Sequence, residues 1–215
     1  MGSEMCIRDR SKDIVKIKKI IRICRTWPTE KFGGVGLHAY NYSKYINIPT
    51  DVFVKEIDGN NKPLKLENVS FITVNYKDIL LNRTNNKLKL LLILITKLKG
   101  EIIMFINLFN KIDRKLIKES ILHVHSANYL IGGFLISYLH KIPIILQLGG
   151  TDIVRIKQSY IHRIILRKIK YFICVNDNIK KQIKLLNKKA NIEIVGNSAD
   201  LDLFQSKKKD DNKYT

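Results

Sequence analysis

Glycines follow two apolar runs of this sequence at points where a ligand could be held. Gly33 and Gly34 follow the run IIRICRTWPTEKF, and Gly149 and Gly150 follow IPIILQL. In an open parallel sheet, ligands bind at the carboxyl ends of the strands. Glycine at such an end lets backbone amides approach a ligand, often an anion at the start of the next helix. The two stretches are therefore predicted to line one crevice.

Small and polar residues also follow the strand-like runs of the second half. They occur in HVHSAN (123–128), QLGGTD (147–152), ND (176–177) and GNSAD (196–200). All of them would lie on one edge of a parallel sheet, which is its binding edge. No Cys/His spacing typical of a metal site occurs. The candidate binding residues are Gly33, Gly34, His125, Ser126, Gly149, Gly150, Asp152, Asn176, Asn197 and Asp200.

The elements that must position these residues are short apolar runs separated by helical stretches. The runs are continuous rather than alternating, as in parallel strands that are buried on both faces. Strands that alternate with helices predict a doubly wound, mainly parallel, Rossmann-like α/β sheet. We predict strands at 17–25, 50–57, 69–74, 120–124, 143–148, 171–175 and 191–195. We predict helices at 37–45, 88–118 (two segments broken near Gly100), 129–140, 159–170 and 178–186.

The composition is strongly basic. Lys and Arg number 39 against 19 Asp and Glu, and the net charge is +20. One explanation of this charge is an A/T-rich genome, because Lys, Asn and Ile are heavily used and their codons are A/T-rich. The other explanation is that the protein binds an anionic membrane or an anionic substrate. A nucleic-acid site is suggested by charge alone, without the basic and aromatic clustering of such sites. Cys24 and Cys174 lie inside apolar runs and indicate buried thiols in a reducing compartment.

The chain is predicted to hold one domain and to be a fragment. The first ten residues, MGSEMCIRDR, read as a translated sequencing adapter and are excluded from fold reasoning. The domain is predicted over 11–204, and 205–215 is a polar tail or the truncated start of an interdomain region. The apolar stretch 87–112 is interrupted by Lys97, Lys99 and Glu101, so it indicates a core helix or one that rests on a membrane surface, not a membrane span.

The motifs, taken in order, resemble a known family. HVHSAN, PIILQLGGTDI, YFICVND and IEIVGNSADLDLF resemble the N-terminal domain of GT-B, family-four-type glycosyltransferases. RTWPTEKFGGVGLHAY resembles their first loop and helix, and the resemblance covers residues 17–204. There are departures: Gly149 stands where the family usually has His, Asn176 where Ser is usual, and Ser198-Ala199 replaces Gly-Val. The family's second Rossmann domain is absent from the sequence.

The resemblance implies the acceptor-side domain of a glycosyltransferase. A nucleotide sugar would be the donor substrate, with no cofactor and no metal, and the acceptor would be a glycan or lipid-linked molecule of cell-surface polysaccharide or glycolipid synthesis. The protein would be cytoplasmic, peripheral on the inner face of an anionic membrane. The absent C-terminal domain would pack against this one and bind most of the nucleotide sugar, so the chain alone is not expected to turn over.

The roles of individual residues stay open between two alternatives each. The amides of residues 33–34 could face the donor diphosphate, or form a tight turn that needs positive φ. His125, the candidate catalytic residue, could orient substrate hydroxyls or be a strand-end histidine without a ligand. Asp152 could bind an acceptor hydroxyl or cap the following helix. Asn197 and Asp200 are expected to fix the interdomain turn rather than touch substrate.

Two other functional classes compete with this one. The first is a non-catalytic sugar- or anion-binding module that pairs with a separate donor subunit. The second is a basic, nucleic-acid-binding Rossmann-like protein. His38, His140 and His162 lie on predicted helices and are interpreted as ordinary surface or core residues.

Overall fold

The computed structural model describes residues 6–8, 14–24, 27, 34–55, 64–74, 102–103, 105–112 and 117–196. Predictions that fall on Gly33, Asn197 and Asp200 therefore lie outside the described residues. The main sheet has seven parallel strands in the order β5-β4-β3-β6-β7-β8-β9. These strands are β3 (Lys19–Cys24), β4 (Thr50–Lys55), β5 (Val69–Val74), β6 (Ser120–His125), β7 (Ile144–Leu148), β8 (Tyr171–Cys174) and β9 (Asn191–Ile194).

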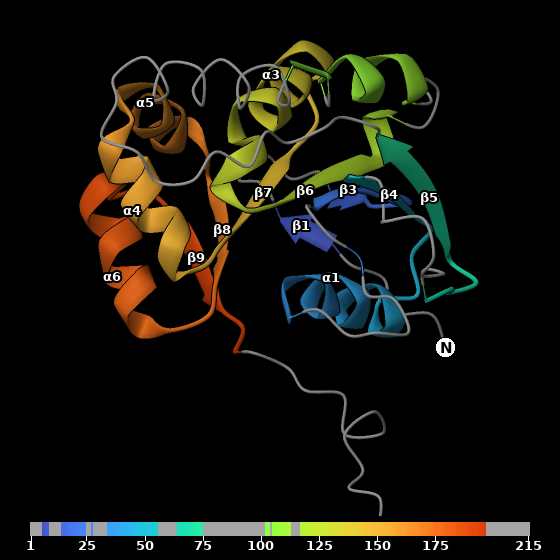
Figure 1. The fold of residues 1–215 in the computed structure, drawn as a ribbon, viewed down its shortest axis with the longest axis horizontal. Coiled ribbons are helices and arrows are strands. Elements are labelled where there is room, and N and C mark those ends of the chain that lie inside the picture. Colours follow the sequence, from blue (N-terminus) through green and yellow to red (C-terminus); the bar gives the residue numbers. More distant parts are fainter. Residues whose placement is uncertain are drawn as a thin grey trace, which may run out of the picture.

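Helices cover both faces of this sheet (Figure 1). The chain first builds outward from β3 to β5, and then returns to place β6 against the other side of β3. Right-handed crossovers put helices on opposite faces when the direction of winding reverses. Accordingly α1 (Gly34–Tyr45) lies on one face. The other face carries α3 (Leu130–His140), α4 (Gly150–Gln158), α5 (Tyr160–Lys168) and α6 (Asp177–Leu186). The predicted doubly wound, parallel fold is confirmed.

A short two-stranded antiparallel sheet lies apart from the main one. It pairs β1 (Cys6–Arg8) with β2 (Ile14–Lys16). Two short 3-10 helices, η1 (Ile117–Glu119) and η2 (Ala127–Tyr129), flank β6. Residues 102–103 and 105–111 are helical, in agreement with the helix predicted there.

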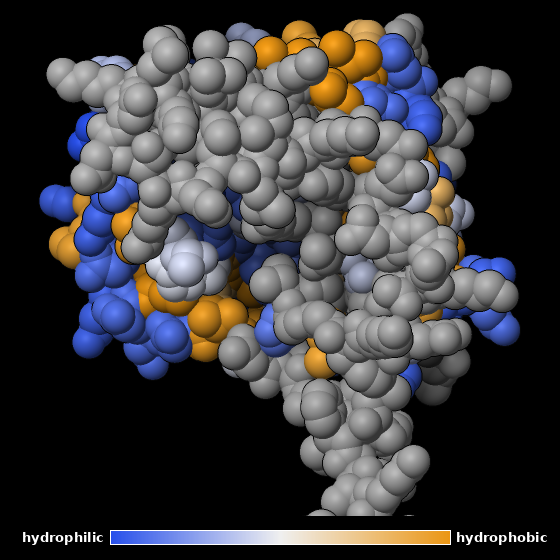
Figure 2. Space-filling model, viewed as in Figure 1, coloured by the Kyte–Doolittle hydropathy of each residue, from blue (hydrophilic) through white to orange (hydrophobic). Residues whose placement is uncertain are grey.

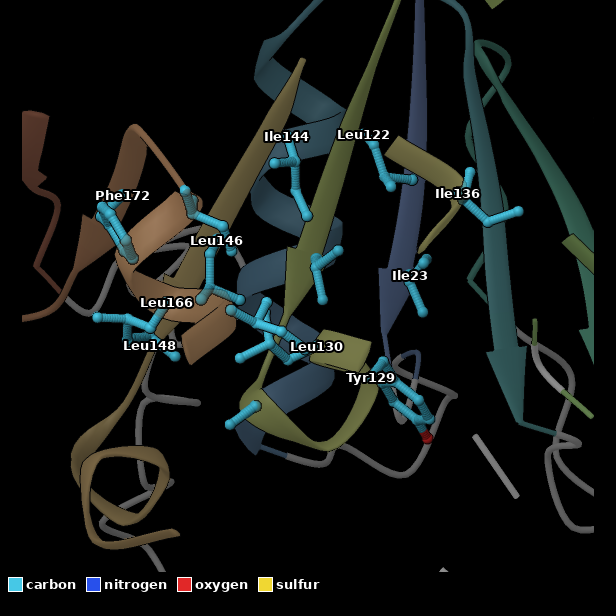
Figure 3. Close-up of a cluster of buried hydrophobic side chains, with 14 of the residues drawn as sticks. Ile23, Leu122, Tyr129, Leu130, Ile136, Ile144, Leu146, Leu148, Leu166 and Phe172 are labelled. Carbon is cyan, nitrogen blue, oxygen red and sulfur yellow. The ribbon is translucent and has the colours of Figure 1, made fainter. Parts of the chain in front are cut away.

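The main hydrophobic core lies between the sheet and the layer of α3 to α6 (Figure 3). Ile23, Leu122, Leu146 and Phe172 point from successive strands into this layer and are at most 2% exposed. At Gly133 the α3 backbone comes so close to β6 that an added Cβ would lie 2.6 Å from Val124 Cγ2. The absence of a side chain at this glycine sets the distance between helix and sheet.

One helix was not predicted. The predicted elements include none at 150–158, but the structure forms α4 there, with Ile153 and Ile156 buried against the core. Ser159 separates α4 from α5, because its N–H bonds back to Arg155 O and its Oγ accepts from His162 N. The other predicted strands and helices within the described ranges are present, with ends shifted by a few residues.

No helix in the described part of the chain has both the length and the apolar character required to span a bilayer.

Candidate functional site

The loop after β6 and the start of α4 are joined by the Asp152 carboxylate. Its Oδ1 accepts hydrogen bonds from Ser126 Oγ and Ala127 N, both at 2.9 Å, and its Oδ2 accepts from Gly149 N at 2.8 Å. An ionised carboxylate forms strong bonds with such donors. Asp152 thus ties two strand ends together, in addition to satisfying an N–H at the start of α4, and the geometry favours the capping alternative.

Ser126 adopts a backbone conformation that only glycine reaches easily. Its φ is 100° and its ψ is 146°. Such a conformation costs of order 1–3 kcal/mol and needs support from its surroundings. Three hydrogen bonds supply this support. Ser126 N donates to Gln147 O at 3.0 Å, and Ser126 Oγ donates to the Asp152 carboxylate. The same Oγ accepts from Asn128 N at 3.2 Å. The strained residue stands at the carboxyl end of β6, on the predicted binding edge.

His162 supports this loop from α5. Its Nε2 lies 3.2 Å from Ala127 O, and its Nδ1 lies 2.7 Å from Ser159 Oγ. Burial lowers the pKa of His162, and the hydrogen bond to Ala127 opposes that shift in part. The structure therefore places this histidine in a defined structural role, which its position on a predicted helix did not reveal.

A second group of polar side chains lies where α1 meets the sheet, buried except for the half-buried Tyr42 of α1, and we call it the imidazole cluster. It consists of Arg22, Tyr42, His123, His125 and Gln147. Strand register makes Arg22 the neighbour of His123, and His125 the neighbour of Gln147. The two imidazole rings are 4.1 Å apart between centroids, and the Tyr42 ring lies 5.9 and 6.0 Å from them. Of this cluster only His125 was predicted as a site residue.

Arg22 is the least expected member, because it sits inside the apolar run of β3 and is fully buried. It donates hydrogen bonds to Ala39 O and to Ser43 Oγ, and so attaches α1 to the sheet. Burial lowers the pKa of Arg22 to about 10. Its Nε and Nη2 have no hydrogen-bond partner among the described residues. A sequence signal existed, since a charged residue in the middle of a predicted buried strand is rare without a partner.

The two histidines of the cluster are held neutral. Burial first, and then the charge of Arg22, lower the pKa of His123 well below 6.5, although an interaction with Gln147 opposes the shift. Burial also lowers the pKa of His125 well below 6.5, followed by the effects of His123, Arg22 and His38. The Nε2 atoms of both rings and Gln147 Oε1 lack partners in the described structure. Neutral imidazoles at this position can exchange hydrogen bonds with hydroxyl groups but carry no charge.

The remaining candidates occupy the edge itself. Gly34 begins α1, and no described glycine has a positive φ, so the tight-turn alternative is not supported there. Gly149 has φ −100°, and an added Cβ would meet only Asp152 Oδ2 at 3.6 Å, while Gly150 faces open space. Asn176 caps α6, its Oδ1 accepting from Ile179 N at 3.0 Å. At this edge the loop after β6, which contains Ser126, and the start of α4, with Gly149, Gly150 and Asp152, are therefore held together by hydrogen bonds to the Asp152 carboxylate.

Comparison with known proteins places this fold in a class. No protein-family model matches the sequence, and no curated protein matches it. Solved structures do match, and they show an α/β, Rossmann-like fold of the kind found in GT-B glycosyltransferases.

Two of the matching structures have TM-scores of 0.56 and 0.52. One is a sucrose-phosphate synthase from Thermosynechococcus elongatus, with a TM-score of 0.56 and 13% identity over 86% of this chain and 49% of that one. The other is described as "Trehalose-6-phosphate from E. coli bound with UDP-2-fluoro glucose", with a TM-score of 0.52 and 10% identity over 77% of this chain and 41% of that one. The chain thus spans less than half the length of either. At this level of identity the likeness establishes the fold, and it agrees with the fold that the sequence resemblance implied.

Proposed function

We propose that this chain is the acceptor-side domain of a nucleotide-sugar-dependent glycosyltransferase that acts on a glycan or lipid-linked acceptor. The observation that carries the proposal is the placement of unpaired, buried, uncharged polar atoms beside the switch point of a GT-B-like sheet. His125 Nε2 and Gln147 Oε1 lack partners in the described structure, at the carboxyl ends of β6 and β7. Ligands bind at such ends in doubly wound sheets, and buried polar atoms without partners need an explanation.

Each part of the edge has a role in this proposal. The amides at the starts of α1 and α4 would face the negative charge of a nucleoside diphosphate, which departs during sugar transfer. The neutral imidazole of His125 would exchange hydrogen bonds with a sugar hydroxyl. His125 is only 3% exposed, so the half-buried Tyr42 side chain beside it would move aside on binding. Asp152 and Ser126 are positioning residues that hold the loop in place.

The proposal also covers the location of the protein in the cell and its partners. A cytoplasmic enzyme on the inner face of an anionic membrane would meet lipid-linked acceptors there, and the net charge of +20 suits such a surface. The nucleotide sugar would enter as a substrate, bound mostly by a second Rossmann domain. That second domain would pack against the edge that carries the imidazole cluster.

Ligand-observed NMR with UDP-glucose tests the site. Half of a binding cleft is expected to hold this probe only weakly, with a Kd near ~1 mM, which saturation transfer detects. Replacing His125 by Ala removes one hydrogen bond worth about 1–1.5 kcal/mol and is expected to weaken binding about five- to tenfold. His140→Ala is the matched control, because His140 ends α3 on the face of the sheet opposite α1 and the imidazole cluster. This variant should leave the affinity for UDP-glucose unchanged.

Two results would count against the proposal. The first is the absence of saturable binding by UDP-glucose and by other nucleotide sugars. The second is binding that His125→Ala and Gln147→Ala leave unchanged while both variants keep the wild-type thermal midpoint. Where His125→Ala loses binding together with folding, Gln147→Ala is the deciding variant, because it removes the unpaired Oε1 and leaves both imidazole rings in place. It should weaken binding while the protein stays folded.

A further inference from the structure

Three helices on one side of the molecule expose apolar side chains to solvent. They are the helical residues 102–103 and 105–111, α3 and α5, and they lie side by side in the outer layer (Figure 1). The Phe109 ring lies 5.5 Å from the His140 ring of α3, and α3 also contacts α5. The exposed apolar side chains of this face are Ile102, Ile106, Leu135, Tyr138, Leu139, Tyr160, Ile161 and Ile164. We call this surface the outer face.

The exposure is not the ordinary scatter of single apolar residues. On α3, Gly133 and Ile136 face the core while Tyr138 and Leu139 are 71% and 55% exposed. On α5, Leu166 is fully buried while Ile164, two positions earlier and so on the opposite side of the helix, is 38% exposed. α3 is therefore apolar on both sides, whereas a surface helix of a soluble domain usually has one apolar stripe. α5 exposes Tyr160, Ile161 and Ile164 next to its own exposed cations. Contiguous exposed apolar surface of this kind marks an interaction site.

The charges of the outer face are of one sign. Among the described residues of the three helices there is no Asp or Glu, although Glu101 directly precedes the first of them in sequence. The exposed cations at this surface are Lys111, Lys141, Arg167 and Lys168. Figure 2 shows hydrophobic residues next to hydrophilic ones along the edge that carries α3. Apolar side chains ringed by basic ones, without acidic ones, match the surface of an anionic bilayer.

We propose that the outer face docks on an anionic phospholipid bilayer, with the apolar side chains of α3 and α5 inserted between headgroups and the cations on lipid phosphates. This surface deepens the proposed function, since it would bring the crevice to lipid-linked acceptors, but its evidence does not involve the sugar site. A second copy of the chain is a poorer partner, because two outer faces would bring like charges together. A nucleic acid would leave the exposed Leu and Ile side chains without an apolar partner.

Vesicle flotation tests the proposal on the intact chain. We expect binding to vesicles of phosphatidylcholine mixed with phosphatidylglycerol, much weaker binding to phosphatidylcholine alone, and release by salt. Arg167→Gln with Lys168→Gln should lower the partition coefficient about 25-fold, at about fivefold per cation. Tyr138→Ser with Leu139→Ser should lower it by a similar factor through loss of inserted apolar surface.

Matched controls come from the solvent-exposed side of α6 and from α1, which lies on the opposite face of the sheet. Leu185→Ser removes an apolar side chain that is 75% exposed, and Lys44→Gln with Lys181→Gln removes two exposed cations. These variants should bind vesicles like the wild type.

The proposal is overturned if anionic vesicles do not bind the chain, or if the control variants lose as much binding as those of the outer face. It is also overturned if sedimentation shows a dimer that only the outer-face variants dissociate. UDP-glucose binding is measured without vesicles, so failure of the sugar site and failure of the membrane surface are seen separately.

Discussion

Replacing Asp152 by Ala should destabilise the whole domain rather than only weaken a ligand. The carboxylate accepts hydrogen bonds from Ser126 Oγ, Ala127 N and Gly149 N at 2.8–2.9 Å. A hydrogen bond to a charged group contributes about 1.5–3 kcal/mol, but the group is half-buried and the contributions are not additive. We therefore expect the free energy of unfolding to fall by about 3 kcal/mol.

Urea denaturation followed by circular dichroism measures this change, and a thermal melt gives a second value. For a domain of this size about 1 kcal/mol shifts the melting midpoint by roughly 2–4 °C, so the expected fall is roughly 6–12 °C. Asp152→Asn keeps one acceptor oxygen and should lose about half as much stability. Asp177→Ala is the matched control, because Asp177 is an exposed acidic residue in the first turn of α6. Its removal should cost about 0.3–1 kcal/mol.

A loss below ~0.5 kcal/mol for Asp152→Ala would refute the reasoning, because it would mean that the carboxylate does not hold the two strand ends together. If affinity for UDP-glucose fell while stability stayed unchanged, Asp152 would instead be a ligand contact, which is the alternative that the sequence left open.

The remaining predictions concern packing, strain and pH. Gly133→Ala should destabilise the domain by about 1–2 kcal/mol, because its Cβ would lie 2.6 Å from Val124 Cγ2. In a double-mutant cycle, the same substitution made in the Val124→Ala background should be nearly neutral. Ser126→Gly should be more stable than Ser126→Ala by about 1–2 kcal/mol in urea denaturation, because both lose the hydroxyl but only Gly relieves the backbone at φ 100°. Burial lowers the pKa of His123 and of His125, so the folded protein holds both imidazoles neutral while the unfolded chain protonates them below pH ~6.5. The free energy of unfolding should therefore be at its full value above pH ~6.5. Below that pH it should fall by up to ~1.4 kcal/mol per pH unit for each imidazole. A variant with Asn at both positions should show a shallower acid limb, and an unchanged slope would contradict the buried neutral pair.

Much of the fold could be predicted because its signals are local. Continuous apolar runs such as IPIILQL are typical of strands buried on both faces, and their alternation with helices restricts the topology to a doubly wound sheet. The missed helix α4 shows the limit of such signals. Its polar start was predicted only as part of the binding edge. The burial of Ile153 and Ile156 that stabilises the helix depends on the contact of α4 with α6 and η2.

The candidate site was predicted only in outline. Sequence order placed His125, Ser126 and Gly149 at strand ends, and the parallel topology brings those ends to one edge. The partners of these residues come from distant segments, so no spacing could reveal them. Asp152, which follows β7, accepts a hydrogen bond from Ser126 at the end of the neighbouring strand β6. Arg22 lies next to His123 only because β3 and β6 are neighbours in the sheet.

The sequence by itself determined the parallel α/β class, the edge where polar residues gather and the strongly basic charge. Only the tertiary structure decided that Asp152 braces two loops, that His123 and His125 are buried as a neutral pair, and that α3 and α5 expose apolar surface without acidic residues. The reason is physical: apolar periodicity acts along the chain, whereas desolvation and hydrogen-bond pairing depend on which segments pack together in space.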